Sequence, residues 1–211
     1  MKKHHPNVQV YLGTLNTNHI ELVDKILSEP RMKDAVEGIG FQWWGGQILP
    51  EIRKKYPYYK YVQTENECGS GTFDWKAAEH TFNVINHYLG NGCEEYTFWN
   101  AILCDAGISG WDWKQNALIR VDSKTGFAIY TPEYYAVKHF SNMVVAGTKV
   151  LHYKEKGKDK LPVIIFLIPE NKYLVGAGNF NDEPKSLTLQ LGDKYLDVTL
   201  KAHSFNTFSM K

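Results

Sequence analysis

The sequence predicts an α/β protein in which half of a (β/α)8 barrel is followed by a small all-β sandwich module. Up to about residue 146, buried runs of strand length alternate with amphipathic helical segments, as in folds built from strand–helix units. From Thr148 onward the helical periodicity gives way to short strands separated by turn residues, which is typical of a sandwich. The expected domains are therefore a partial barrel at 1–146 and a β-sandwich at 147–211.

Four strand–helix units are expected in the first domain. Strands are expected at 8–12, 38–44, 59–67 and 96–103. Helices are expected at 19–28, 50–56 and 74–89, and from Pro132, capped by Thr131, to about Met143. A hairpin with Lys124-Thr125-Gly126 at its tip precedes the last helix. A complete (β/α)8 barrel usually needs about 250 residues, so four units amount to half of one.

The second domain shows the spacing of a small sandwich. Strands are expected at 149–153, 162–168, 173–179, 187–191, 196–200 and 205–210. Turns are indicated by Gly157, by the polar segment 181–184 and by Gly192-Asp193.

The composition indicates a globular protein and excludes several classes of partner. Of 211 residues, 43% are hydrophobic, which is enough to build a core. Basic and acidic residues nearly balance, 24 against 23, so the chain lacks the broad positive electrostatic field that would bind nucleic acid. No run is apolar enough to insert into a membrane, and the start Met-Lys-Lys-His-His-Pro does not resemble a signal peptide, so the localisation of the parent protein stays open.

The cysteines and histidines give no sign of a metal centre. The three cysteines are too few for a disulfide framework and lack the paired spacing of a zinc site. The histidines are scattered along the chain. We therefore expect free thiols, structural histidines, no metal and no organic cofactor.

Two carboxylates follow the third expected strand. In the segment 61–70, Glu65 and Glu67 stand at the carboxyl end of a strand, where barrel enzymes place catalytic groups. Both share the strand parity of Gln63, so alternation does not say which side chain points inward. The alternative is that one or both only pair with lysines at the rim.

Aromatic side chains gather at the expected strand ends and in the loops after them. They are Trp43, Trp44, Trp99, Trp111 and Trp113, with Gln42, Asn100 and Asn116 as polar companions. An aromatic face packs on the apolar side of a sugar ring, and carboxamides bind its hydroxyls. Any single tryptophan is more often a packing residue, but five at one rim favour a carbohydrate cleft.

With these motifs the sequence resembles glycoside hydrolase family 30, which includes lysosomal glucosylceramidase and bacterial β-glycosidases. The motifs are Gly38-Ile39-Gly40-Phe41-Gln42-Trp43, Gln63-Thr64-Glu65-Asn66-Glu67-Cys68-Gly69, Phe98-Trp99-Asn100, Trp113-Lys114-Gln115-Asn116 and Ala202-His203-Ser204-Phe205-Asn206-Thr207-Phe208. The resemblance covers nearly the whole chain and matches the fifth to eighth strand–helix units and the β-sandwich of the family. It implies a retaining, glucosylceramidase-type glycosidase of carbohydrate or sphingolipid metabolism.

The resemblance also implies roles for individual residues. Glu65 falls on the family's nucleophile, the glutamate that follows a serine or threonine at the end of the seventh strand, and Glu67 is the second choice. Trp99 matches the tryptophan on which the sugar stacks. Asn116 matches an asparagine that lines the active-site rim, and Gln42 and Trp43 fall in the first motif at the substrate site. Gln42 stands where the glucosylceramidase branch has histidine, so the chain is closer to the bacterial branch.

The sequence departs from the family pattern on its amino-terminal side. The family's acid/base glutamate ends the fourth strand in an Asn-Glu-Pro setting, and no such tripeptide occurs here. Glu51, Glu94 and Glu95 are poor substitutes because of their positions on a helix or at a strand's start. We therefore expect that the acid/base lies outside this chain, which would be inactive alone and would pair with the missing half barrel or with a second copy. The alternatives are a non-catalytic carbohydrate-binding remnant and one subunit of a split enzyme.

Overall fold

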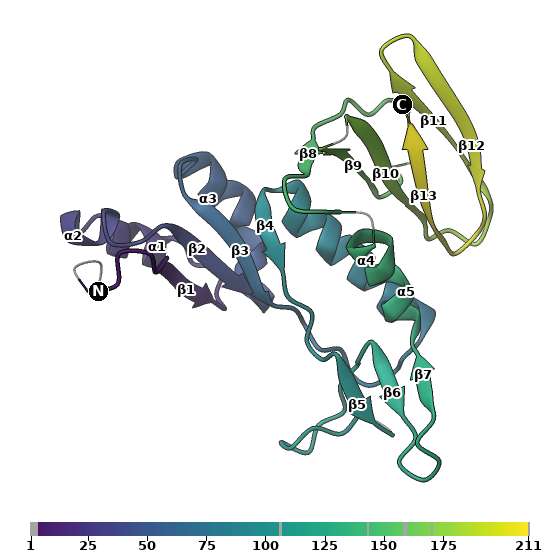
Figure 1. The fold of residues 1–211 in the computed structure, drawn as a ribbon, viewed down its shortest axis with the longest axis horizontal. Coiled ribbons are helices and arrows are strands. Elements are labelled where there is room, and N and C mark those ends of the chain that lie inside the picture. The colour runs from purple at the N-terminus through teal and green to yellow at the C-terminus, as the bar shows by residue number, and fades with distance from the viewer. Residues whose placement is uncertain (1–3, 106, 143, 158–159, 170, 211) are drawn as a thin grey trace. The chain divides into compact units, whose positions relative to one another are not determined.

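The computed structural model describes residues 4–105, 107–142, 144–157, 160–169 and 171–210 (Figure 1). Contacts divide the chain into two compact units, each made of two segments. The first unit comprises Met1–Cys68 and His87–Trp99, and the second comprises Gly69–Asn86 and Asn100–Lys211. The expected domain boundary at residue 146 stays a prediction, because these units interleave along the sequence.

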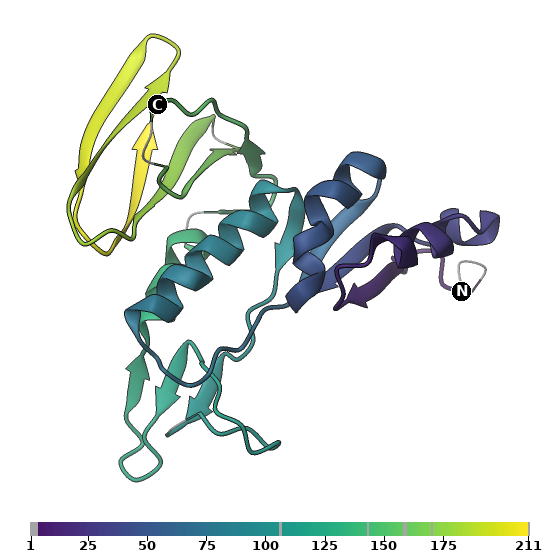
Figure 2. The same cartoon turned by 180° about the vertical axis from the view of Figure 1, so that it is seen from behind.

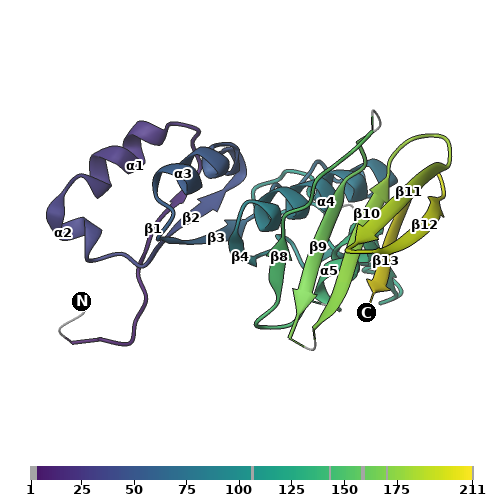
Figure 3. The same cartoon turned by 90° about the horizontal axis from the view of Figure 1, so that it is seen from above.

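The first unit is built on a parallel sheet in the order β1-β2-β3-β4. Its strands are β1 (Tyr11–Leu15), β2 (Gly38–Gln42), β3 (Lys60–Glu65) and β4 (Cys93–Tyr96). Its helices are α1 (Ile20–Leu27), α2 (Pro30–Lys33), the 3₁₀ helix η1 (Trp43–Ile48), α3 (Leu49–Lys55) and the last turn of α4 (Trp75–Gly90). Figure 3 shows α1 and α3 on one face of this sheet, the arrangement expected when helices connect parallel strands.

The core of the first unit lies between β2 and these helices. Ile39 and Phe41 of β2 are fully buried, as are Val23 of α1 and Leu49 and Ile52 of α3. The glycines of β2 let its neighbours come close, since a Cβ at Gly38 would stand 2.4 Å from the carbonyl oxygen of Lys60. The sequence Gly-Ile-Gly-Phe-Gln therefore forms a central strand with small and large residues in alternation.

Three expected elements of the first unit differ in the structure. The first strand runs over Tyr11–Leu15 rather than 8–12, because pairing with β2 begins at Tyr11 opposite Gly38. The second strand stops at Gln42, because Trp43 has a positive φ of 46° and starts η1. The fourth expected strand, 96–103, divides into β4 and a separate β5 (Ile102–Cys104), because residues between them bond to side chains of β3 and its following turn.

The second unit begins with most of α4 and contains a small sheet in the order β5-β6-β7. β6 (Ile119–Val121) and β7 (Ala128–Tyr130) form the expected hairpin. Helix α5 (Pro132–Ser141) follows, and the Thr131 hydroxyl accepts a hydrogen bond from the Tyr134 N–H as its cap. Met143, where the sequence predicted the helix to end, lies outside the described residues.

The carboxyl-terminal strands form the predicted all-β module. One antiparallel sheet has the order β13-β10-β9-β8, and β11 pairs with β12. The strands are β8 (Lys149–Leu151), β9 (Val163–Ile168), β10 (Lys172–Asn179), β11 (Lys185–Leu191), β12 (Lys194–Leu200) and β13 (Ser204–Met210). Val175 and Ala177 of the larger sheet share a buried cluster with Leu189 and Leu200 of the hairpin, so the two sheets pack face to face.

Aromatic rings join α4, α5 and the β-module within the second unit. Phe82 of α4 is fully buried, and its ring centroid lies 5.0 Å from that of Phe140 and 5.2 Å from that of Phe205. Figure 2 shows α4 and α5 from the reverse side. Because these contacts come from a helix stripe and from the last strand, the module shares one core with the helices beside it.

Candidate active site

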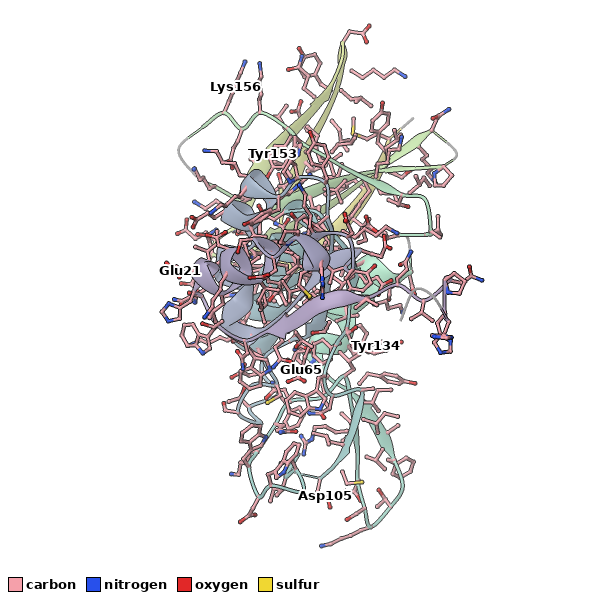
Figure 4. The ribbon with its side chains drawn as sticks, turned by 90° about the vertical axis from the view of Figure 1, so that its left-hand side faces the viewer. Glu21, Glu65, Asp105, Tyr134, Tyr153 and Lys156 are labelled. Atoms are coloured by element: carbon pink, nitrogen blue, oxygen red, sulfur yellow. The ribbon has the colours of Figure 1, made fainter. Side chains whose placement is uncertain are left out.

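Glu65, labelled in Figure 4, is the last residue of β3 and is half-buried. In the parallel sheet it lies opposite Gln42, the last residue of β2. The carboxyl ends of parallel strands meet at one edge of a sheet, which is where α/β enzymes place their reacting groups. The structure therefore brings together two of the predicted site residues at this edge.

Trp43 holds the Glu65 carboxylate directly. Its indole Nε1–H donates to Glu65 Oε1 over 2.7 Å. The Trp43 backbone has a φ of 46°, a left-handed conformation that is costly for a bulky residue and is found at sites where the fold imposes it. A hydrogen bond from an N–H group to a carboxylate fixes the orientation of that carboxylate.

Trp99 lies beside Trp43 and is held by its backbone. The two rings have centroids 6.2 Å apart at an angle of 52°. The Trp99 N–H donates to Asn66 Oδ1, and Asn66 is only 4% exposed. Trp99 thus lies beside the tryptophan that bonds Glu65, and its backbone is bonded to the residue that follows Glu65.

Buried carboxamides anchor the segment that carries Trp99. Gln63 Oε1 accepts a hydrogen bond of 2.6 Å from the Thr97 N–H, and Asn66 Nδ2 donates to the carbonyl oxygen of Glu67 over 2.6 Å. Neither of these two roles was predicted from the sequence. The only sequence feature that could have indicated them is that Gln63 and Asn66, two amide side chains, stand on either side of Glu65.

Gln42 is also fixed at this edge. Its side-chain oxygen accepts a hydrogen bond of 2.7 Å from the hydroxyl of Thr14, which belongs to β1. Its Nε2 group stays available as a donor at the same end of the sheet as Glu65. This placement supports the predicted role of Gln42 in contacting substrate.

Glu67 is distinguished from Glu65 by its position. β3 ends at Glu65, so strand alternation does not extend to Glu67, which is exposed in the following turn. Glu65 ends the strand itself and accepts a hydrogen bond from the indole of Trp43. The geometry therefore favours Glu65 as the reacting carboxylate of the two.

Asn116, the fourth predicted substrate residue, lies in the second unit. It is 1% exposed, its Nδ2 donates to Glu133 Oε2 over 2.8 Å, and its Oδ1 accepts from the Gly71 N–H over 2.6 Å. Both ends of the amide are engaged, so these contacts support a role in fixing the loop at Gly71. Direct contact between Asn116 and substrate stays a prediction.

Of the other three predicted rim tryptophans, Trp44 is 59% exposed in η1 of the first unit, and Trp111 and Trp113 belong to the second unit. Trp111 is 75% exposed and Trp113 is 44% exposed, and their rings lie 6.2 Å apart in an edge-to-face arrangement. Both follow β5 in the loop that the sequence predicted. Their role in binding sugar stays a prediction.

Within the described ranges, no group of three or more histidine, cysteine or acidic side chains is placed to hold a metal ion. Across those same residues, every helix falls short of the length and apolar composition needed to cross a bilayer.

No protein-family model matches the sequence. Solved structures resemble its fold closely. One is SrfJ from Salmonella typhimurium, with a TM-score of 0.86, 16% identity, and coverage of 100% of this chain and 49% of that one. Another is the endo-β1,6-glucanase BT3312, with a TM-score of 0.77, 17% identity, and coverage of 90% and 44%.

A third similar structure is a glycoside hydrolase family 30 endoxylanase from Clostridium papyrosolvens C71. Its TM-score is 0.74, its identity 14%, and the match covers 96% of this chain and 56% of that one. The chain thus spans about half the length of the proteins that it resembles. Its fold is that of the carboxyl-terminal portion of family 30 enzymes, including their β-sandwich, as the sequence motifs predicted.

Proposed function

We propose that this chain supplies the nucleophile half of a retaining β-glycosidase active site, with Glu65 as the nucleophile. The observation that carries the proposal is the Glu65 carboxylate at a parallel strand's carboxyl end, bonded to Trp43, whose ring lies beside that of Trp99. The family 30 fold of its structural neighbours supports the same reaction class.

In this reaction a carboxylate attacks the anomeric carbon and a carboxylic acid about 5 to 5.5 Å away protonates the departing oxygen. The glycosidic C–O bond breaks as the ester bond to Glu65 forms. Water, deprotonated by the second group, then hydrolyses the ester and returns Glu65 to its ionised form. Trp43 would orient the carboxylate, Trp99 would stack on the sugar, and Gln42 would donate to a hydroxyl.

The proposal assigns the acid/base to a residue outside this sequence. The family's Asn-Glu-Pro motif is absent here, and Glu94 and Glu95 lie at the start of β4, toward its amino end, whereas Glu65 is at the carboxyl end of β3. A polypeptide that carries the first four strand–helix units would complete the half barrel and bring the acid. The first half barrel, or a second copy of this chain, is the proposed protein partner.

The substrate is proposed as a β-linked glycan. The named neighbours act on β-1,6-glucan or are xylanases, so glucose- and xylose-containing β-glycosides are the substrates to test first. None of these three is named as a glucosylceramidase, and a lipid-linked substrate has no further support from them.

The test uses this chain combined with a separately expressed polypeptide that supplies the four preceding units. Aryl β-glucosides and β-xylosides should be hydrolysed by the mixture. Glu65→Gln should lower turnover by about a thousandfold or more, because the nucleophile is lost, whereas Glu67→Gln should change it by less than about tenfold. A 2-fluoroglycoside should label the peptide that contains Glu65.

The reverse order of the two variants would contradict the assignment of the nucleophile. Binding of β-glycosides by the mixture without any hydrolysis would favour the alternative of a non-catalytic carbohydrate-binding protein. Replacing Trp99 and measuring hydrolysis in the same assay would test its proposed stacking on the sugar.

A further inference from the structure

A cavity of about 500 Å³ lies within the second unit, between α4 and the β-module. Its walls come from α4, from described residues between β8 and β9, and from the two residues that follow β10. This volume falls within the range of about 300 to 1,000 Å³ that is common for small-molecule sites. None of the residues assigned to the proposed reaction lines it.

Three asparagines line this cavity. Asn83 and Asn86 stand three positions apart on α4 and therefore share a face of the helix. Asn181 is held in place, because its Nδ2 donates over 2.8 Å to Oδ1 of the fully buried Asn179. Each carboxamide has a hydrogen-bond donor and an acceptor at fixed spacing. This pair matches adjacent hydroxyl groups of a ligand, each of which can donate and accept a hydrogen bond.

Two aromatic rings complete the walls. Tyr153, labelled in Figure 4, donates its hydroxyl proton to the carbonyl oxygen of Val163 over 3.1 Å. Its side chain is nevertheless 45% exposed, so the ring is fixed and still open to a ligand. Phe180 is held edge-on to Phe82, with centroids 6.0 Å apart. Fixed aromatic rings beside carboxamides are the surfaces that sugar rings use.

The charges at the cavity favour a neutral ligand. Glu155 and Lys160 both line it and have opposite signs, so their fields oppose each other. A phosphate or a carboxylate ligand would need several converging cations, and a metal ion would need several carboxylates.

From this combination we propose that the cavity between α4 and the β-module is a second, non-catalytic binding site for one or two residues of a neutral oligosaccharide. The ligand's hydroxyls bond to Asn83, Asn86 and Asn181, and its apolar face packs on Tyr153. The site does not depend on hydrolysis at Glu65. Its biochemical use would be to retain the chain on a polymeric glycan.

The test is a titration of the whole chain, labelled with nitrogen-15, with β-1,6-linked glucotriose, cellotriose and xylotriose. At least one of these should give saturable shifts in the side-chain amide signals of Asn83, Asn86 and Asn181. Tyr153→Ala should weaken binding by about tenfold and Asn86→Ala by about fivefold, because a ring face and a hydrogen-bonding group are lost. Tyr153→Phe should keep most of the affinity, since it keeps the ring.

Tyr58→Ala is the matched control, because Tyr58 is 97% exposed and does not line the cavity. Glu65→Gln should leave these shifts unchanged, which separates this site from the proposed reaction. The proposal is overturned if none of the three sugars shifts the asparagine amides at millimolar concentration, or if Tyr153→Ala binds like the unaltered chain.

Discussion

Glu133 is a buried carboxyl group in the second unit that is held by hydrogen bonds from two side chains. Its oxygens accept from Asn116 over 2.8 Å and from the Thr81 hydroxyl over 3.4 Å. Burial raises the pKa of Glu133 from 4.5 to about 7, and the two hydrogen bonds oppose this rise only in part. The nearby Asp74 carboxylate raises the pKa further. The Glu133 carboxyl therefore keeps its proton in the folded protein to a higher pH than it does in the unfolded chain.

This shift makes stability depend on pH. Below the unfolded pKa of 4.5, the carboxyl is protonated in both the folded and the unfolded state and does not lower the free energy of unfolding. As the pH rises from there through about 7, the unfolded chain releases the proton first, so stability is lost, on the order of 3 kcal/mol in total. Glu133→Gln should remove this loss and make the protein more stable than the unaltered chain at pH 8. Urea unfolding of the unaltered chain and of the Glu133→Gln variant, each at pH 5 and at pH 8, measures these changes in the free energy of unfolding.

The control for this prediction is Glu51→Gln, since Glu51 is exposed in the first turn of α3 and belongs to the other compact unit. It should not remove the fall in stability between pH 5 and pH 8. Equal pH dependence in the Glu133→Gln variant and the unaltered chain would show that Glu133 does not cause it.

At the scale of elements, the sequence predicted the strands of the β-module well, and it predicted where the strands of the first unit begin and end less well. All six strands of the module match their predicted positions within two residues at each end, because their alternation and turn residues agree. The expected strand 96–103 was wrong over its middle. Its apolar pattern continued through Trp99, but the Thr97 and Trp99 N–H groups bond to Gln63 and Asn66, and such long-range bonds leave no local pattern.

The candidate site was predictable in its residues but not in their contacts. Glu65, Gln42, Trp43 and Trp99 could be found from strand ends and motifs. The preference for Glu65 over Glu67 came from the family's Thr-Glu pattern, because strand alternation does not distinguish the two residues. The bond from Trp43 to Glu65 depends on a positive φ at a bulky residue, which no propensity predicts.

The 3₁₀ helix η1 sets the position of Trp43, and a glycine lets it pack. A Cβ at Gly45 would stand 1.8 Å from the carbonyl oxygen of Leu15. Gly45→Ala should therefore push η1 away from the end of β1 and lower the free energy of unfolding by about 1 to 3 kcal/mol. Denaturant unfolding followed by tryptophan fluorescence measures the change.

Gly110→Ala provides the comparison, because nothing lies within 4 Å of a Cβ added there. Its unfolding free energy should stay within about 0.5 kcal/mol of that of the unaltered chain. If Gly45→Ala were equally silent, η1 would not pack against β1 as closely as the structure indicates.

At the scale of the whole molecule, the two edges of the four-stranded sheet differ in how they are protected. β4, at one edge, carries the exposed side chains of Glu94 and Glu95 within the strand. This strand was expected to begin only at residue 96, and the structure instead includes the two charges in the edge strand. β1, at the other edge, has the sequence Tyr-Leu-Gly-Thr-Leu and no charge. A strand edge without charge or proline invites pairing with another chain.

The chain should therefore self-associate through β1 rather than β4. In sedimentation velocity runs over a range of concentrations, the unaltered chain should show a rising proportion of dimers or larger species. Thr14→Lys should reduce this association, because Thr14 is exposed on β1 and a lysine there would have to be desolvated, or placed beside its copy, when two edges pair. Thr72→Lys adds the same charge on an exposed loop, and it should associate like the unaltered chain. A chain that stays monomeric at every concentration, or that associates equally in all three forms, would exclude β1 as the pairing edge.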